Sequence, residues 1–253
     1  MKNLTWFFIS SMSIFFSASV LADSSNTAAA PMIFAADKVK KIQVENGAGN
    51  VLIAGKKGSD ARVESKKIKW DDRCVLDVIL VNDKLQVRAT VKNQLGQRSS
   101  DCQVDLSITI PSETKVDVDV NLGAGGLHIV DVQGELSTIL GSGELKVENY
   151  VGKKITVQSG NGDVTLDGNF TDGDIQVGKG NIRMTYRNAP ATGSLKLNTG
   201  YGDATLFFPK DAKIKTEFQA GMGHVSNELG DTSRATYSVS MQTGKGELAI
   251  RKI

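Results

Sequence analysis

Residues 155–166 read Ile-Thr-Val-Gln-Ser-Gly-Asn-Gly-Asp-Val-Thr-Leu, and the fold prediction follows from this pattern. Two glycines separated by one residue stand between two segments in which apolar and polar residues alternate. Alternation with a period of two is typical of a β-strand that buries one face. Glycine suits a tight corner because it has no Cβ. The stretch therefore predicts two short strands joined by a sharp turn.

The same Gly-x-Gly motif recurs along the chain from residue 123 onward, with one earlier copy. Its first glycines are separated by 18, 19, 18, 22, 21 and 23 residues. A period near twenty residues indicates stacked coils that are stable only against their neighbours. The predicted turn glycines are Gly47, Gly49, Gly123, Gly125, Gly141, Gly143, Gly160, Gly162, Gly178, Gly180, Gly200, Gly202, Gly221, Gly223, Gly244 and Gly246.

The apolar residues keep the same phase in each copy, as Ile155 and Val157 before the glycines and Val164 and Leu166 after them show. Equivalent strands of successive coils should then stack in parallel, about 4.8 Å apart. We predict an all-β chain: a single parallel β-solenoid, β-helix-like, with two strands per coil of about 18–23 residues. A β-sandwich is the alternative, but it would not require glycine pairs in register.

The chain divides into an export signal, a leader and one domain. Residues 1–22 read as a signal peptide, with Lys2 before an apolar run and a small-residue cleavage site at Ala22; a retained anchor at 4–21 is the alternative. Residues 23–36 are expected to be a flexible leader, and 37–253 the solenoid domain. Within it we expect 61–110 to be an irregular hairpin and meander that caps one end, and the charged residues 251–253 to close the other. The mature chain is predicted to have no transmembrane segment and to be periplasmic or secreted.

Composition excludes some partners. The sequence has 30 basic and 28 acidic residues, and this near-neutral balance argues against nucleic acid, which needs clustered positive charge. Lysines gather near the start of the domain, and they fit either a solvated strand face or a surface for anionic glycan or lipid.

Cys74 and Cys102 are the only cysteines. In an exported chain an even number of cysteines usually pairs. Residues 75–81 and 84–90 read as a hairpin around Asn82-Asp83, with 103–110 returning beside it, so both cysteines should lie at the same end of a meander. We predict one disulfide.

Amide side chains recur two positions before the first glycine of five copies. If the coils stack, these side chains form an outward row, which is either an ordinary polar face or a surface that contacts carbohydrate. The candidate binding face consists of Gln158, Gln176, Asn198, Gln219 and Gln242.

Several patterns resemble catalytic or metal sites without completing them. Glu144, Asp163 and Asp203 stand in one corner column, and Asp163 and Asp203 should lie roughly 10 Å apart, a spacing compatible with an inverting glycosidase. The same column could supply calcium ligands, but Gly126 and His224 interrupt it. His128 and His224 belong to distant coils. Residues 173–179 have phosphate-loop spacing but no Ser or Thr follows Lys179. We therefore predict no catalytic residue, no metal site and no cofactor.

The runs 118–125, 156–164 and 244–250, together with Leu206-Phe207-Phe208-Pro209, resemble a bacterial domain family called "putative adhesin". The likeness covers roughly residues 38–253. It implies an extracytoplasmic right-handed β-solenoid with no established catalytic residue. Gly126, where a polar residue usually stands, and Asn227 at an inward site depart from the pattern.

The function expected from these observations is binding. The first hypothesis is an exported, non-enzymatic envelope protein whose rigid face contacts an envelope glycan or protein. A carbohydrate-active β-helix enzyme and a purely structural envelope protein are the alternatives.

Overall fold

The computed structural model describes residues 30–92 and 102–253, and these residues are almost entirely β-structure. The predicted signal peptide and residues 23–29 of the predicted leader lie outside the described residues. A short 3₁₀ helix, η1, spans Ala36–Lys38. The strands are β1 (Met32–Ala35), β2 (Lys41–Ala48), β3 (Val51–Lys56), β4 (Asp60–Lys69), β5 (Cys74–Val81), β6 (Lys84–Val91), β7 (Gln103–Pro111), β8 (Asp117–Ala124), β9 (Leu127–Val130), β10 (Leu136–Ser142), β11 (Leu145–Asn161), β12 (Val164–Lys179), β13 (Ile182–Tyr186), β14 (Gly193–Tyr201), β15 (Ala204–Phe208), β16 (Ile214–Met222), β17 (Val225–Asn227), β18 (Tyr237–Lys245) and β19 (Leu248–Lys252).

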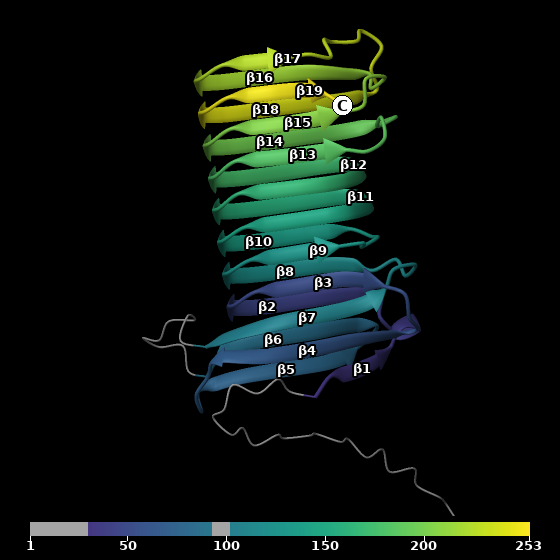
Figure 1. Cartoon of the computed structure of the whole chain (residues 1–253), viewed down its shortest axis with the longest axis vertical. Coiled ribbons are helices and arrows are strands. Elements are labelled where there is room, and N and C mark those ends of the chain that lie inside the picture. The colour runs from purple at the N-terminus through teal and green to yellow at the C-terminus, as the bar shows by residue number, and fades with distance from the viewer. Residues whose placement is uncertain (1–29, 93–101) are drawn as a thin grey trace, which may run out of the picture.

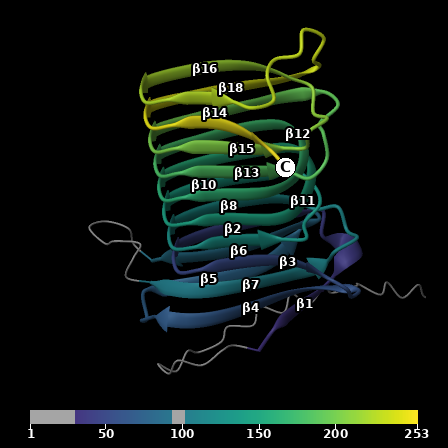
Figure 2. The same ribbon diagram turned by 45° about the horizontal axis from the view of Figure 1, so that its top comes forward.

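The strands stack into a tall body with two faces (Figure 1). Face 1 runs β5-β6-β2-β8-β10, then the second halves of β11 and β12, then β14-β18-β16. Face 2 runs β1-β4-β7-β3-β9, then the first halves of β11 and β12, then β13-β15-β19-β17. Figure 2 shows the chain turning repeatedly from one face to the other along the same edge.

Pairing is parallel along most of both faces, but the sheet as a whole is mixed. β1 pairs antiparallel with β4, β4 with β7, and β5 with β6. Within the segment 61–110, expected to be an irregular hairpin and meander, the described residues form regular strands. The predicted hairpin around Asn82-Asp83 is the antiparallel pair β5–β6, and the antiparallel pairs stand at one end of the stack (Figure 1). The prediction of a single parallel solenoid is therefore correct only in part, because these antiparallel strands belong to the same sheet. β-Structure also begins earlier than predicted, at Met32 in β1.

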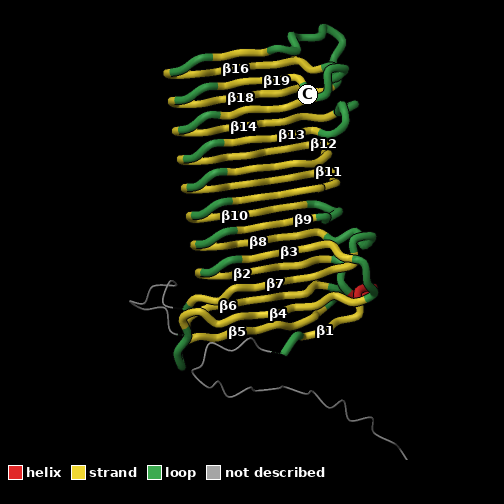
Figure 3. The backbone as a smooth tube through the Cα atoms, viewed as in Figure 1, coloured by secondary structure: helices red, strands yellow, loops and turns green. Residues whose placement is uncertain are grey.

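The prediction of two separate strands per coil also fails in the middle of the stack. β11 and β12 each continue from face 2 around the far edge to face 1, so one strand serves two coils. Elsewhere this edge carries loops of varied length, whereas short turns line the glycine edge (Figure 3). Insertions therefore accumulate on the edge opposite the glycines.

Coils do not always stack in chain order. β18 lies between β14 and β16, and β19 lies between β15 and β17. At the other end, β2 lies between β6 and β8, and β3 between β7 and β9. The expectation that residues 251–253 close one end is therefore wrong: β16 and β17 form that end.

The core fills the space between the faces. Inward residues of face 1, such as Val157 and Ile175, and of face 2, such as Val147 and Leu166, belong to one cluster of buried side chains. Within the same cluster, a group of aromatic side chains lies near the far edge. Ring centroids are 4.8 Å apart for Phe170 and Tyr186 and 4.6 Å apart for Tyr186 and Phe208. This packing orients each face and leaves its alternate residues facing solvent.

Candidate functional site

The glycine edge is built by direct stacking of backbone on backbone. A Cβ added at Gly160 would lie 2.5 Å from the carbonyl oxygen of Gly141, the glycine of the adjacent coil. At Gly162 a Cβ would collide with the Gly143 carbonyl, and φ there is +137°. The turn glycines are therefore required by close approach and, at the second position of each pair, by a left-handed backbone. They position the functional surfaces and are not themselves a binding site.

The predicted amide residues do form one row on face 1. Gln158 is in register with Gln176, Gln176 with Asn198, Asn198 with Gln242, and Gln242 with Gln219. The inserted strand β18 explains why Gln242 precedes Gln219 in space. We call this set the amide row.

The amides do not bond to one another as a stacked ladder would. Among the described residues, the side-chain hydrogen bond of the row is from Gln176 Nε2 to Asp174 Oδ1, at 3.3 Å. A shallow groove of about 410 Å³ runs beside the row, lined by Gln158, Gln176 and Asn198 with exposed Ile139 at one end. The row therefore offers uncommitted donors and acceptors to a partner.

The acidic column at the glycine edge has a structural role. Asp163 Oδ1 accepts a hydrogen bond of 2.7 Å from the backbone N–H of Asn181. Asn181 Oδ1 accepts one of 3.0 Å from Asp203 N–H, and Asp203 Oδ1 one of 2.7 Å from Glu247 N–H. Each of these side chains thus accepts a hydrogen bond from a backbone N–H of the next coil. This use accounts for the recurring Asn and Asp without catalysis or calcium, and sequence reasoning missed it.

The column is interrupted at Gly126. Asp105 Oδ1 accepts from Asn50 N–H at 2.7 Å, and Asn50 Oδ1 from Gly126 N–H at 3.0 Å, but Gly126 has no side chain to continue the series. Beside this gap lies a hollow of about 520 Å³ on face 2, lined in part by Leu52, His128 and Glu144. The departure at Gly126 was the sequence signal that could have located it.

Both histidines are placed as surface residues of distant coils. His128 in β9 lies 2.6 Å from the Glu148 carboxylate, and Lys146 Nζ lies 3.1 Å from the same group. Hydrogen bonds from these partners hold the pKa of Glu148 below its ordinary value, and the bond from Lys146 has the larger effect. His224 is exposed at the other end of the stack. The two rings cannot share a metal ion.

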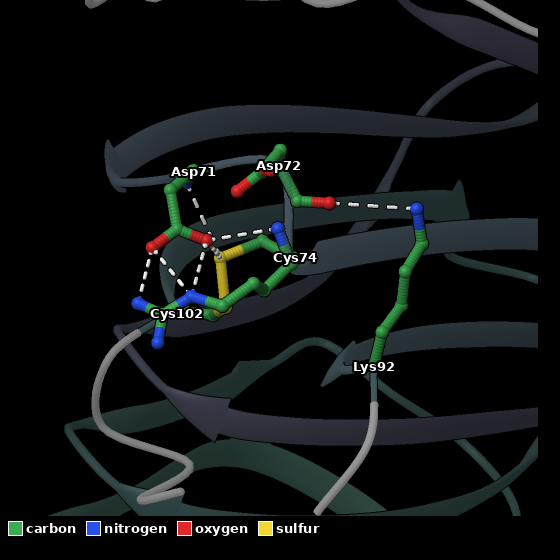
Figure 4. Close-up of a disulfide and its surroundings, with 6 residues drawn as sticks. Asp71, Asp72, Cys74, Lys92 and Cys102 are labelled. Carbon is green, nitrogen blue, oxygen red and sulfur yellow. Dashed lines mark hydrogen bonds and ion pairs between the residues drawn. A yellow bond between two sulfur atoms is a disulfide. The ribbon is translucent and has the colours of Figure 1, made fainter.

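Cys74 and Cys102 form the predicted disulfide, with Cα atoms 5.6 Å apart (Figure 4). It ties the start of β5 to the residue before β7. Asp71 lies beside it, and hydrogen bonds from Arg73 lower the pKa of Asp71. The Asp71 backbone N–H also lies 3.4 Å from Cys74 Sγ. Asp71 and the two sulfurs cluster closely enough for a metal ion, but oxidised sulfurs offer no thiolate ligands.

None of the helices in residues 30–92 and 102–253 has the length and apolar character that a membrane crossing needs. No curated protein matches the chain. Solved structures that resemble it include a "putative cell adhesion protein" from Clostridium sporogenes, at 13% identity and a TM-score of 0.43 over 90% of this chain and 99% of that one. A "putative adhesin" from Bacteroides fragilis shares 14% identity at a TM-score of 0.46, over 90% and 98% of the two chains. A "putative lipid binding protein" from Parabacteroides distasonis shares 10% at 0.29, over 88% and 96%.

Residues 117–252 match the family model described as Toastrack DUF4097. The match spans the regular coils from β8 to β19, where the glycine pairs recur. It agrees with the resemblance to the "putative adhesin" family that the motifs indicated. Since the match covers more than half of the sequence, the chain belongs to the Toastrack DUF4097 family.

Proposed function

We propose that this protein is an exported, non-enzymatic binding protein of the cell envelope, adhesin-like, and that the amide row of face 1 contacts a glycan or protein partner. The observation that carries the proposal is the register of five amide side chains across five neighbouring strands. Each amide can donate and accept hydrogen bonds, so a regular row suits a ligand with repeating polar groups.

Rigidity supports this role. The central strands of face 1 pair on both sides, and their inward residues are packed in the common core. A row on such a surface loses little conformational freedom when it binds. The disulfide fits an extracytoplasmic protein, because disulfides persist in oxidising compartments.

The enzymatic alternative has weaker support. Asp163 and Asp203 each use a carboxylate oxygen to accept a backbone N–H of the adjacent coil. A general acid or base must instead be free to exchange a proton with substrate. We propose that these residues stabilise the coil stack.

The test uses the mature chain and two matched variants. The triple variant Q158A/Q176A/Q242A removes three of the five amides, whereas T156A/S240A changes outward residues on the same face and leaves the row intact. We expect binding on an array of bacterial envelope glycans and purified envelope proteins to be lost only in the amide variant. Equal binding by both variants would contradict the proposal. Turnover of any glycan on the same array, abolished by Glu144→Ala, Asp163→Ala or Asp203→Ala with binding retained, would favour the enzyme.

A further inference from the structure

The hollow at Gly126 is separate from the amide row, since it lies on face 2. It crosses β4, β7, β3, β9 and the first half of β11. Strands in a sheet are about 4.8 Å apart, so the hollow spans roughly 19 Å across the strands. That length accommodates an elongated small ligand better than a single compact group.

Gly126 differs from the other corner glycines because nothing in the fold requires it. A Cβ there would meet only Asn50 Oδ1, at 3.2 Å, and its φ is not in the left-handed region. An Asn or Asp at this position could also accept a hydrogen bond from the backbone N–H of the next coil, as the equivalent side chains of other coils do. Glycine at a position of this kind is typical of a surface that another molecule approaches closely.

Two rails of side chains border the hollow. The rail along the glycine edge follows the register of the coils and contains Lys66, Asp105, Asn50, Gly126 and Glu144. The rail on the open side of face 2 contains Glu64, Ser107, Leu52, His128 and Lys146.

The charges on these rails nearly balance. Each end carries one acid and one base, Glu64 with Lys66 and Glu144 with Lys146. The remaining carboxylate, Asp105 in the middle, already accepts a hydrogen bond from Asn50 N–H, so three acids face two lysines. A strongly charged ligand would meet repulsion at either end. A neutral ligand rich in hydroxyl groups can donate to the carboxylates and accept from the lysines and Asn50 Nδ2.

Backbone pairing excludes a peptide strand at this site. β7, β3, β9 and β11 are flanked by strands on both sides, so their main-chain groups are used in the sheet. Strand addition needs a free edge. A ligand in the hollow must therefore be recognised by side chains, with Leu52 providing an apolar contact for its C–H groups.

We propose that the hollow at Gly126 binds a neutral oligosaccharide, with the two rails as its hydrogen-bonding partners and Leu52 as its floor. Glu148 positions two of these partners, since it holds both His128 and Lys146. The proposal does not depend on the amide row, which faces the other side of the stack.

The test titrates the mature protein with three neutral trisaccharides, maltotriose, cellotriose and triacetylchitotriose, and with anionic trigalacturonate, by isothermal calorimetry. We expect at least one neutral trisaccharide to bind, and trigalacturonate to bind at least tenfold more weakly. Gly126→Asn should fill the gap, supply an acceptor for Glu144 N–H, leave the thermal midpoint unchanged or higher, and weaken binding at least tenfold. Gly230→Asn is the matched control, because a Cβ at Gly230 meets open space and its φ of +73° tolerates Asn.

If Gly126→Asn does not fold, Leu52→Glu replaces it, with Thr165→Glu in the same outward row as control. Absence of binding by all three neutral sugars, tighter binding of trigalacturonate, or wild-type affinity in the folded Gly126 and Leu52 variants would overturn the proposal. Loss of trisaccharide binding in Q158A/Q176A/Q242A but not in Gly126→Asn would also overturn it and leave the amide-row proposal standing. The reverse pattern would support the hollow alone.

Discussion

The carboxylate of Asp163 accepts a 2.7 Å hydrogen bond from the backbone N–H of Asn181, the residue that occupies its position in the next coil. The relationship repeats from Asn181 to Asp203 and from Asp203 to Glu247. Side chains along the glycine edge therefore link coils in addition to the strand pairing. This column of Asp and Asn side chains therefore holds adjacent coils together.

Asp163→Ala should lower the free energy of unfolding by about 0.5–1.5 kcal/mol, because it removes one such hydrogen bond. Asp163→Asn should be nearly neutral, since an amide oxygen accepts the same bond, as Asn181 does. Urea denaturation followed by circular dichroism measures both. Equal destabilisation by the two substitutions would show that the charge of Asp163, and not its acceptor oxygen, is what matters.

Gly162→Ala should destabilise the protein by about 3 kcal/mol or more, because it combines a strained φ of +137° with collision against the Gly143 backbone. Gly126→Ala should cost less than about 1 kcal/mol, since a Cβ there would meet only a side-chain atom, Asn50 Oδ1 at 3.2 Å, and no backbone. Thermal unfolding of the two variants compares the effect of an alanine at two positions of the glycine edge. Similar midpoints would contradict the stacking of the glycine columns.

Leu166→Asp should cost about 3–5 kcal/mol, because Leu166 is 2% exposed and an unpaired carboxylate would enter the core. Thr165→Asp, on the outward side of the same strand, should change stability by no more than about 0.5 kcal/mol. Denaturant midpoints give the comparison. If the two variants unfold alike, the division of β12 into inward and outward residues is wrong.

Cys74→Ser combined with Cys102→Ser should lower stability by about 3–4 kcal/mol, the value for a closed loop of this length. The two residues are 28 positions apart, and they hold the antiparallel end of the stack together. Reduction of the native protein should produce the same loss. A double variant as stable as the oxidised protein would show that the end cap does not need the covalent link.

Stability should fall as the pH rises above about 10, the ordinary pKa of tyrosine. Burial raises the pKa values of Tyr150, Tyr186 and Tyr237, so these phenols stay protonated in the folded state while the unfolded chain ionises. Unfolding then releases protons, and the stabilisation that is complete below pH 10 is lost above it. Denaturation between pH 8 and 11 measures the slope. Tyr237→Phe should reduce this slope, because it removes one of the buried phenols.

Local sequence features were enough to specify the shape of one coil. Strand alternation and the glycine pairs are local features, so residues such as Ile155, Gly160 and Leu166 specify which side chains face inward and where the chain turns. The same periodicity placed the five amides in one row. Even the disulfide followed from the hairpin around Asn82, because a tight turn fixes which strand ends meet.

The order of the coils can be read only from the folded structure, because each open edge can accept any coil with matching phase. β18 presents Val239 and Met241, both fully buried, whereas β16 presents Phe218, which stays partly exposed. The more apolar coil therefore takes the interior place, and the coil that carries Asn227 becomes the end, where that side chain accepts hydrogen bonds from Leu229 and Gly230. The hollow at Gly126 was hidden for the same reason: it is shaped by β4 and β7, which only stacking brings beside β3 and β9.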